Sequence, residues 1–221
     1  DPDLMETSAS AWTGPVQNQT IMVAGGGGVG ESDRSSRRID LIRLDDPLPR
    51  FVPGPDLPEG TRYPHLVQLP DDSTLITNGS RDYRGRGASD NHIARIYHPA
   101  TNTLSVVADP LVGRNYHSSA LLLPDGRVLT VGSDPLFRDK KNSITGEFEQ
   151  RMEIYTPPYL FRGARPAILD APATAAYGST FTARVTGPRQ VNSARLIRPG
   201  SATHMLNTDQ RSIALGLEAG P

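Results

Sequence analysis

Tyr116 and His117 stand next to each other in the chain, and a phenol beside an imidazole can bind a metal ion or transfer a proton. They precede residues 118–123, SSALLL, a run apolar enough for a buried strand. Residues 124–126, PDG, then form a turn, because Pro fixes φ and Gly accepts a positive φ. Residues 127–131, RVLTV, alternate as a second strand rich in β-branched side chains. The sequence therefore predicts a β-hairpin with the two reactive side chains at its mouth.

A third candidate side chain, His204, lies in the polar stretch 200–211 between two strand-like runs. A loop this long and polar can reach Tyr116 and His117 if its module packs against the end of the preceding repeats. Two neutral imidazoles and a phenol suit copper(II), which accepts nitrogen and oxygen donors in tetragonal geometry. The residues also leave a structural role open, in which the Tyr-His pair forms hydrogen bonds within its sheet and His204 caps a turn.

If Tyr116 and His117 bind the same ion, the backbone between them cannot be a regular strand. Adjacent residues on a regular strand point to opposite faces of the sheet. For both side chains to bind one ion, the chain must therefore bend at the entry of the strand.

Repeated segments predict the architecture that positions these residues. The run LPDDSTLITNGS from Leu69 returns as LPDGRVLTVGS from Leu123, and three β-branched runs end at Gly26, Gly79 and Gly132, at intervals of 53 residues. A period near fifty with four short strands per unit is typical of kelch-type β-propeller blades. A β-sandwich with accidental internal similarity is the alternative.

The sequence pattern changes near Gly163, where the repeated segments end and short strand-like runs separated by Pro and Gly begin. We expect an all-β chain with about three kelch-like blades in residues 1–162 and the N-terminal half of an Ig-like β-sandwich, or early set, domain in residues 163–221. A closed propeller needs about four to eight blades and a complete sandwich about 100 residues. Both domains are therefore expected to be incomplete, as in a piece of a larger polypeptide.

Three further histidines are expected to have no role as ligands. His65 occupies in its repeat the position of His117 in the next, but Pro64 replaces the adjacent tyrosine, which favours a hydrogen-bonding histidine in the blade core. His98, in the outer-strand signature, and His92, at the end of a polar loop, are expected at the surface.

Composition excludes some classes of partner. With 23 basic and 24 acidic residues the formal charge is −1, so neither nucleic acid nor a membrane surface is an expected partner. No apolar run is long enough to cross a bilayer. The chain contains no cysteine, so its redox compartment cannot be inferred from disulfides.

Two separated segments resemble one known family. Residues 114–128, RNYHSSALLLPDGRV, look like the tyrosine-histidine blade of the galactose oxidase and glyoxal oxidase family, the copper radical oxidases. Residues 202–211, ATHMLNTDQR, resemble the ATH-x-x-NTDQR loop in that family's C-terminal domain. The two motifs come in the family's order, and the similarity covers essentially the whole chain.

The resemblance implies one copper ion, with His117 and His204 as equatorial ligands, Tyr116 as the axial ligand, and Tyr116 as the catalytic general base. In this family a second tyrosine, cross-linked to a cysteine and oxidised to a radical, removes a hydrogen atom from an alcohol or hydrated aldehyde. Oxygen then reoxidises the copper, and hydrogen peroxide is released. The implied partners are the small-molecule substrate, O2 and the remaining propeller blades, and the implied location is extracellular or at the cell surface.

Departures from the family pattern narrow this expectation. Because the chain has no cysteine and no assignable radical tyrosine, the Cys-Tyr radical cofactor is expected in a missing N-terminal part. Residues 28–31, GVGE, stand where galactose oxidase carries a substrate-contacting Tyr-Gln pair, so a glyoxal-oxidase-like enzyme for small aldehydes is favoured over a galactose-specific one. The alternatives are a kelch-type binding scaffold with a structural Tyr-His pair and a redox-inactive copper-binding relative.

Overall fold

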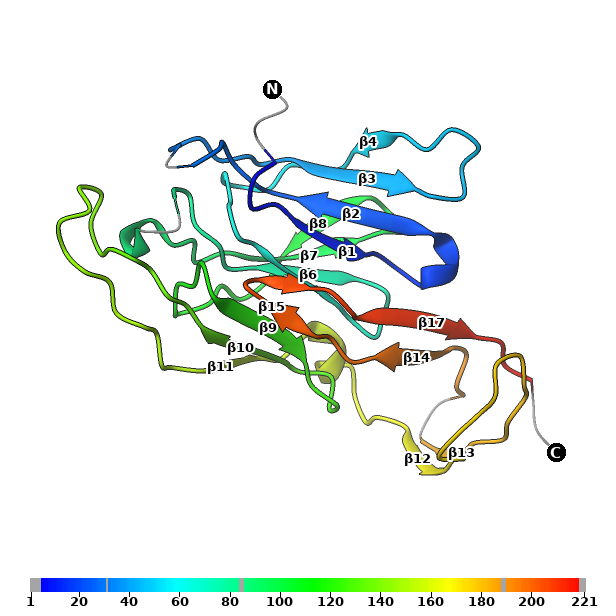
Figure 1. The fold of residues 1–221 in the computed structure, drawn as a ribbon. Coiled ribbons are helices and arrows are strands. Elements are labelled where there is room, and N and C mark those ends of the chain that lie inside the picture. Colours follow the sequence, from blue (N-terminus) through cyan, green and yellow to red (C-terminus); the bar gives the residue numbers. More distant parts are fainter. Residues whose placement is uncertain (1–4, 31, 84–85, 188–189, 219–221) are drawn as a thin grey trace.

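The computed structural model describes residues 5–30, 32–83, 86–187 and 190–218, and the regular secondary structure of this part of the chain is almost entirely β (Figure 1). Short 3-10 helices interrupt it at η2 (Val16–Asn18), η3 (Gly87–Ser89) and η4 (Pro158–Phe161). No helix among the described residues is long and apolar enough to cross a membrane.

Blade 1 is a four-stranded antiparallel sheet at the N-terminal end of the fold (Figure 1). Its strands follow each other in chain order: β1 (Ala9–Trp12), β2 (Thr20–Ala24), β3 (Ile39–Arg43) and β4 (Phe51–Pro53). The sheet is partly buried at its inner strands and exposed at β4, as expected for a blade whose inner edge faces the centre of a propeller.

Blade 2 repeats this meander and is the most buried of the sheets. Its strands are β5 (His65–Gln68), β6 (Thr74–Thr77), β7 (Ala94–His98) and β8 (Thr103–Val106). All residues of β5 and β6 are buried, whereas β8 is largely exposed. β5 lies against β1 on one side and β9 on the other, so blade 2 holds the blades together.

Blade 3 contains the hairpin that the sequence predicts. Its described strands are β9 (Ser118–Leu122), β10 (Val128–Gly132) and β11 (Glu153–Tyr155), in the spatial order β11-β10-β9. The backbone N–H of Gly126 donates to the carbonyl of Leu123 at 2.9 Å, which closes the expected turn. Ser118 pairs with Gly132 at the mouth of the hairpin, beside Tyr116 and His117.

The repeated glycines are required by close backbone contacts at the mouths of the inner hairpins. Gly79 has a φ of +99° and Gly132 a φ of +76°, a region that L side chains rarely adopt. A Cβ atom at Gly79 would lie 2.5 Å from the carbonyl oxygen of Arg62, and one at Gly132 would lie 2.8 Å from that of His117. Gly79 and Gly132, which are 53 residues apart, thus lie opposite the start of the inner strand in their blades.

The C-terminal part forms three small antiparallel pairs. The strands are β12 (Ala167–Asp170) with β13 (Arg184–Thr186), β14 (Ala194–Arg198) with β17 (Arg211–Leu215), and β15 (Ala202–Thr203) with β16 (Leu206–Asn207). The register of the β12–β13 pair is irregular between Ile168 and Asp170. The polar stretch 200–211 contains the short β15–β16 hairpin, which the sequence did not predict. Below, this hairpin is called the His204 hairpin.

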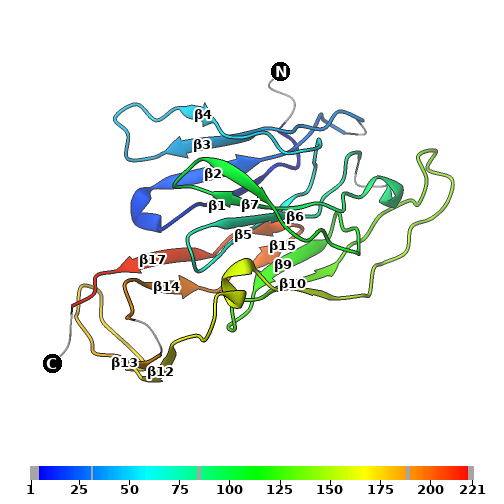
Figure 2. The same cartoon turned by 180° about the vertical axis from the view of Figure 1, so that it is seen from behind.

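The His204 hairpin lies between the inner strands of the blades. It sits next to the green β9 in both views of the fold (Figures 1 and 2), and β16 also lies against β1 and β5. Met205, at its tip, is 5% exposed and belongs to the same hydrophobic core as Leu66, Ile76 and Tyr63. Burying a methionine side chain stabilises a fold by about 1.5–3 kcal/mol. The core of the blades is therefore completed by a residue from the C-terminal part.

Candidate metal centre

The structure brings the three candidate side chains together from segments almost ninety residues apart. The ring centroids of Tyr116 and His117 are 3.8 Å apart, those of His117 and His204 are 5.2 Å apart, and those of Tyr116 and His204 are 5.7 Å apart. Below, these three residues are called the ring cluster. Both histidines are exposed and Tyr116 is half-buried, so the cluster faces solvent at the edge of the described fold.

The backbone bends at the entry of β9, as the sequence predicts for a shared ion. His117 has a φ of 55° and His204 a φ of 60°, so both histidines adopt the left-handed conformation. The same conformation occurs shortly before the inner strands of the other blades, at Tyr63 with a φ of 56° and at Thr7 with a φ of 65°. The bend is thus a feature of every inner strand entry, and blade 3 uses it to place two donor side chains.

Tyr116 is held by its backbone and by its ring. Its N–H donates to the side-chain oxygen of Asn115 at 2.6 Å, and its carbonyl accepts from the N–H of Asp134 at 2.8 Å. The ring packs edge-on against Tyr63, with centroids 5.7 Å apart, and against the core that contains Met205. Its position is therefore set by the blade 2 core as well as by the hairpin.

His117 makes a polar contact through one ring nitrogen. Nδ1 lies 3.2 Å from Oδ2 of Asp134, and 42% of the His117 side chain is exposed. Because a carboxylate oxygen only accepts, Nδ1 carries the proton and the lone pair of the neutral ring is on Nε2. A metal-binding histidine usually donates its second N–H to a carboxylate in this way, which fixes the tautomer and the ring orientation.

His204 also forms a hydrogen bond through Nδ1, but its partner does not determine the tautomer. Its Nδ1 lies 2.9 Å from the Thr203 hydroxyl, and its carbonyl accepts from the N–H of Ser118 at 3.1 Å. A hydroxyl can donate or accept, so Thr203 fixes the ring orientation but not the tautomer. Both histidines of the ring cluster therefore engage Nδ1 in hydrogen bonds to the protein and leave Nε2 for a ligand.

His65 has the hydrogen-bonding role expected of it and lies 1% exposed in the core. Its equivalence with His117 is wrong, however. His65 lies inside β5 opposite Thr77, whereas His117 precedes β9, and the residue with the equivalent bend in blade 2 is Tyr63. The reason is that blade 2 is two residues shorter than blade 3 between the arginine before the inner strand and the turn after it. Burial lowers the pKa of His65 from its usual value near 6.5 to about 4.

The two surface histidines lie outside the ring cluster. Nδ1 of the exposed His92 lies 3.2 Å from the carbonyl of Pro110, and Nε2 of His98 lies 2.8 Å from the Ser105 hydroxyl. Both contacts are local to blade 2.

The donor set of the ring cluster fits copper(II). Two imidazole nitrogens and a phenol oxygen are ligands that this ion accepts. Among the described residues no group of three His, Cys, Asp or Glu side chains could hold a metal ion, so the two imidazoles form a set of three donors only together with the phenol of Tyr116. We therefore regard Tyr116, His117 and His204 as the candidate metal ligands.

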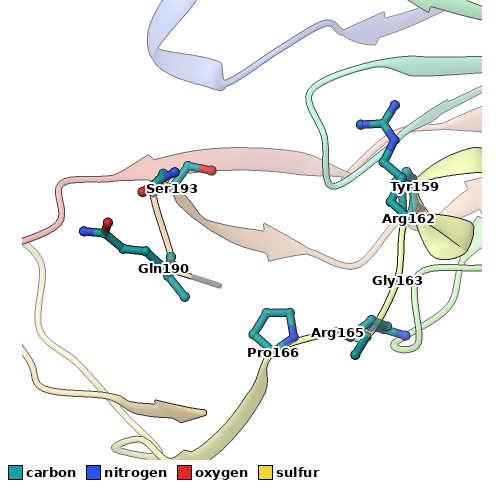
Figure 3. Close-up of a pocket in the computed structure, with 10 residues that line it drawn as sticks. Tyr159, Arg162, Gly163, Arg165, Pro166, Gln190 and Ser193 are labelled. Carbon is teal, nitrogen blue, oxygen red and sulfur yellow. The ribbon is translucent and has the colours of Figure 1, made fainter. Parts of the chain in front are cut away.

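A separate cavity of about 520 Å³ lies at the start of the C-terminal part (Figure 3). It is lined by the segment after η4 and the segment before β14, including Arg162, Arg165 and Gln190. No residue of the ring cluster is among the described residues that line it, and these residues include no carboxylate or imidazole. It is therefore distinct from the candidate metal centre.

Comparison with known proteins identifies relatives of both parts of the chain. The model of the galactose oxidase-like early set domain matches residues 165–220. A galactose oxidase from Gibberella zeae is 38% identical over 160 residues, which are 68% of this chain and 22% of that protein. An aldehyde oxidase GLOX from Vitis pseudoreticulata is 32% identical over 181 residues, which are 72% of this chain and 33% of that protein. The chain belongs to the galactose oxidase and glyoxal oxidase family.

A solved structure extends this family likeness to the fold. The structure of a fungal alcohol oxidase of the AA5 family, in complex with copper, matches with a TM-score of 0.82 and 23% identity, covering 98% of this chain and 46% of that chain. The galactose oxidase-like fold, with propeller blades followed by an early set domain, is thereby confirmed. The chain spans about a fifth to a third of the length of its two sequence relatives named above.

Sequence reasoning missed two residues whose side chains contact the imidazoles of the ring cluster, namely Asp134 and Thr203. For Asp134 a signal existed. Ser118 pairs with Gly132, so the same register continued outward places residue 134 opposite Tyr116. Thr203 precedes His204 in the motif itself, and only the structure shows that its hydroxyl meets the ring. The partners of His65 are distant in sequence and carry no local signal.

Proposed function

We propose that this chain is part of a copper-dependent oxidase that converts a small aldehyde or primary alcohol, with O2, to the oxidised product and hydrogen peroxide. The observation that supports it is the ring cluster, a set of two imidazoles and one phenol with both Nδ1 atoms engaged. The relatives carry the names galactose oxidase and aldehyde oxidase. Tyr116, His117 and His204 are the proposed ligands.

Copper(II) bound there would act as an electron acceptor and as a Lewis acid that favours the deprotonated form of a nearby hydroxyl. The chain's own contribution is positional. Asp134 and Thr203 orient the two imidazoles, and Tyr116 presents a phenol whose oxygen, once deprotonated beside the metal, can accept the hydroxyl proton of a substrate as a general base. The exposed edges of both histidines leave room for a small molecule to approach.

We favour a glyoxal-oxidase-like substrate, a small aldehyde in its hydrated form, over galactose. The basis is the stretch 28–31, which lacks the Tyr-Gln pair of galactose oxidase; residue 31 itself lies outside the described residues. The Cys-Tyr radical cofactor, the extracellular or cell-surface location and the domain boundary at Gly163 stay predictions.

Copper titration of the chain tests the proposal. We expect one copper(II) ion per chain, with an electron paramagnetic resonance (EPR) spectrum typical of nitrogen and oxygen ligands. His117→Ala and His204→Ala are expected to lose this binding, because each removes one of three donors, whereas the matched surface variant His98→Ala keeps it. Unchanged copper affinity in both ligand variants would overturn the site and favour the binding-scaffold alternative.

The activity is tested separately with the full-length protein. Hydrogen peroxide release is measured with a series of small aldehydes, primary alcohols and galactose. Faster release with aldehydes supports the proposed substrate class. Copper binding without peroxide release from any of these substrates contradicts the oxidase proposal and favours the redox-inactive relative.

A further inference from the structure

His65 contacts the residue that follows each histidine of the ring cluster. Its Nδ1 lies 3.1 Å from the carbonyl oxygen of Met205, which follows His204. Its Nε2 lies 2.8 Å from the hydroxyl of Ser118, which follows His117. The ring is 1% exposed, and β5, which carries it, lies against both β9 and β16. One buried side chain thus joins the two segments that supply the ring cluster.

The proton positions on His65 follow from its partners. A carbonyl oxygen only accepts, so Nδ1–H donates to Met205, and the lone pair of the neutral ring is on Nε2 and faces the Ser118 hydroxyl. The same hydroxyl also contacts the carbonyl of Asn115, and a serine has one proton to give. The carbonyl of Asn115 can only accept and therefore shares this proton with Nε2 of His65, which burial keeps neutral near pH 7.

The two segments need such a connection because both hold strained backbone. His117 and His204 have φ values of 55° and 60°, and non-glycine residues persist there only when their surroundings fix them. Among the described residues, a single backbone hydrogen bond joins the two segments, from the N–H of Ser118 to the carbonyl of His204 at 3.1 Å. A single hydrogen bond leaves rotation about itself open, whereas a second contact through a rigid ring removes it.

We propose that His65 is a positioning residue that sets the distance and orientation between the His117 segment and the His204 hairpin, so that both imidazoles meet one ion. This inference rests on the proposed function of the ring cluster as a copper site. His65 touches no ligand side chain in this assignment and acts through Ser118 and Met205. The site is therefore built on blade 2 as well as on the two segments that carry the ligands.

Copper affinity and the EPR spectrum of the 221-residue chain test this role through His65→Leu, which fills the space without hydrogen bonds. We expect a loss of copper(II) affinity of about 10–100-fold, the range typical for residues that support metal ligands, and altered copper hyperfine splitting. His65→Asn retains a donor near the Nδ1 position and is expected to recover part of the affinity. His98→Leu, the same substitution on β7, is the matched control and should leave both readouts unchanged.

The outcomes separate this inference from the proposed function. If the unmodified chain does not bind copper, the proposed function fails and this inference fails with it. If folded His65→Leu binds copper with unchanged affinity and spectrum, the positioning role is overturned while the copper site stands. If His65→Leu does not fold, Ser118→Ala decides, because it removes the Nε2 partner, together with the contact of the same hydroxyl to the Asn115 carbonyl, and keeps the His65 ring. We expect it to weaken copper binding several-fold and to change the spectrum, and unchanged values would overturn the role.

Discussion

His117 and Asp134 face each other across the mouth of the blade 3 hairpin, with Nδ1 of the imidazole 3.2 Å from Oδ2 of the carboxylate. The hairpin register places Asp134 opposite Tyr116, and the Asp134 N–H donates to the Tyr116 carbonyl. One residue therefore holds the backbone of one proposed ligand and the ring of the other. Because 42% of the His117 side chain is exposed, this contact is a main restraint on its ring.

Asp134→Ala is expected to weaken copper(II) binding by about tenfold or more, because the His117 ring loses the acceptor that fixes its tautomer. Asp134→Asn is expected to retain much of the affinity, since its amide oxygen can still accept from Nδ1–H. Isothermal titration with copper(II) measures both. Asp45→Ala, which removes an exposed carboxylate in blade 1, is the control. Equal affinity in Asp134→Ala and the unmodified chain would show that the contact does not matter.

His65 is expected to make the fold sensitive to acid. Its pKa is lowered to about 4 in the folded state and is near 6.5 in the unfolded state, so the unfolded chain binds the extra proton first. The stability linked to this residue is present above pH 6.5 and is lost as the pH falls towards 4. We expect the difference in thermal unfolding midpoint between the unmodified chain and His65→Leu to change in favour of the variant as the pH falls from 7 to 4, because only the unmodified chain loses the stability linked to His65. A difference that stays constant over this range contradicts the assignment.

Asp90 is expected to change the stability of the fold over the same pH range as His65, but in the opposite direction. Burial raises its pKa to about 7, against the hydrogen bond from Asn115, and the Glu149 carboxylate adds to the increase. Its unfolded pKa is near 3.8, so the stability linked to Asp90 is present below about pH 4 and is lost as the pH rises towards 7.

Asp90→Asn tests this assignment, because it removes the ionisable proton and keeps an oxygen that can accept from Asn115 at the Oδ1 position. We expect the variant to gain stability relative to the unmodified chain as the pH rises from 4 to 8, measured by urea unfolding at each pH. Since His65 and Asp90 oppose each other between pH 4 and 7, the unmodified chain shows only their difference. A constant difference in stability between Asp90→Asn and the unmodified chain across this range would be the contrary result.

Local signals carried most of what the sequence predicts about the site. The hairpin at residues 118–132 follows from its Pro-Asp-Gly turn, and the bend at His117 follows from the alternation of side chains along a strand. The approach of the His204 hairpin to Tyr116 was inferred from loop length and the family motif, and the structure places the rings together.

The contacts that the sequence could not give are those between distant segments. His65 and Met205 are separated by 140 residues, and nothing in the composition of either segment links them. The repeat alignment misassigned His65. Blade 2 is two residues shorter than blade 3 between the arginine before the inner strand and the turn after it, so aligning the arginines and aligning the turns pair His65 with different residues of blade 3. Strand pairing, once known, resolves this at once.

Gly132→Ala is expected to disturb the fold and the ring cluster together. The added Cβ would lie 2.8 Å from the carbonyl oxygen of His117, in addition to the cost of a φ of +76°. Gly178→Ala is a matched control, since its φ is +72° but nothing lies within 4 Å of the added atom. Backbone strain of this kind costs about 1–3 kcal/mol, so both variants lose stability in urea unfolding and the excess loss in Gly132→Ala reports the clash. Because that clash displaces the His117 carbonyl, copper affinity should fall in Gly132→Ala and stay unchanged in Gly178→Ala. If the two variants lose the same stability and bind copper with the same affinity, the added methyl group is accommodated at the hairpin mouth without a clash.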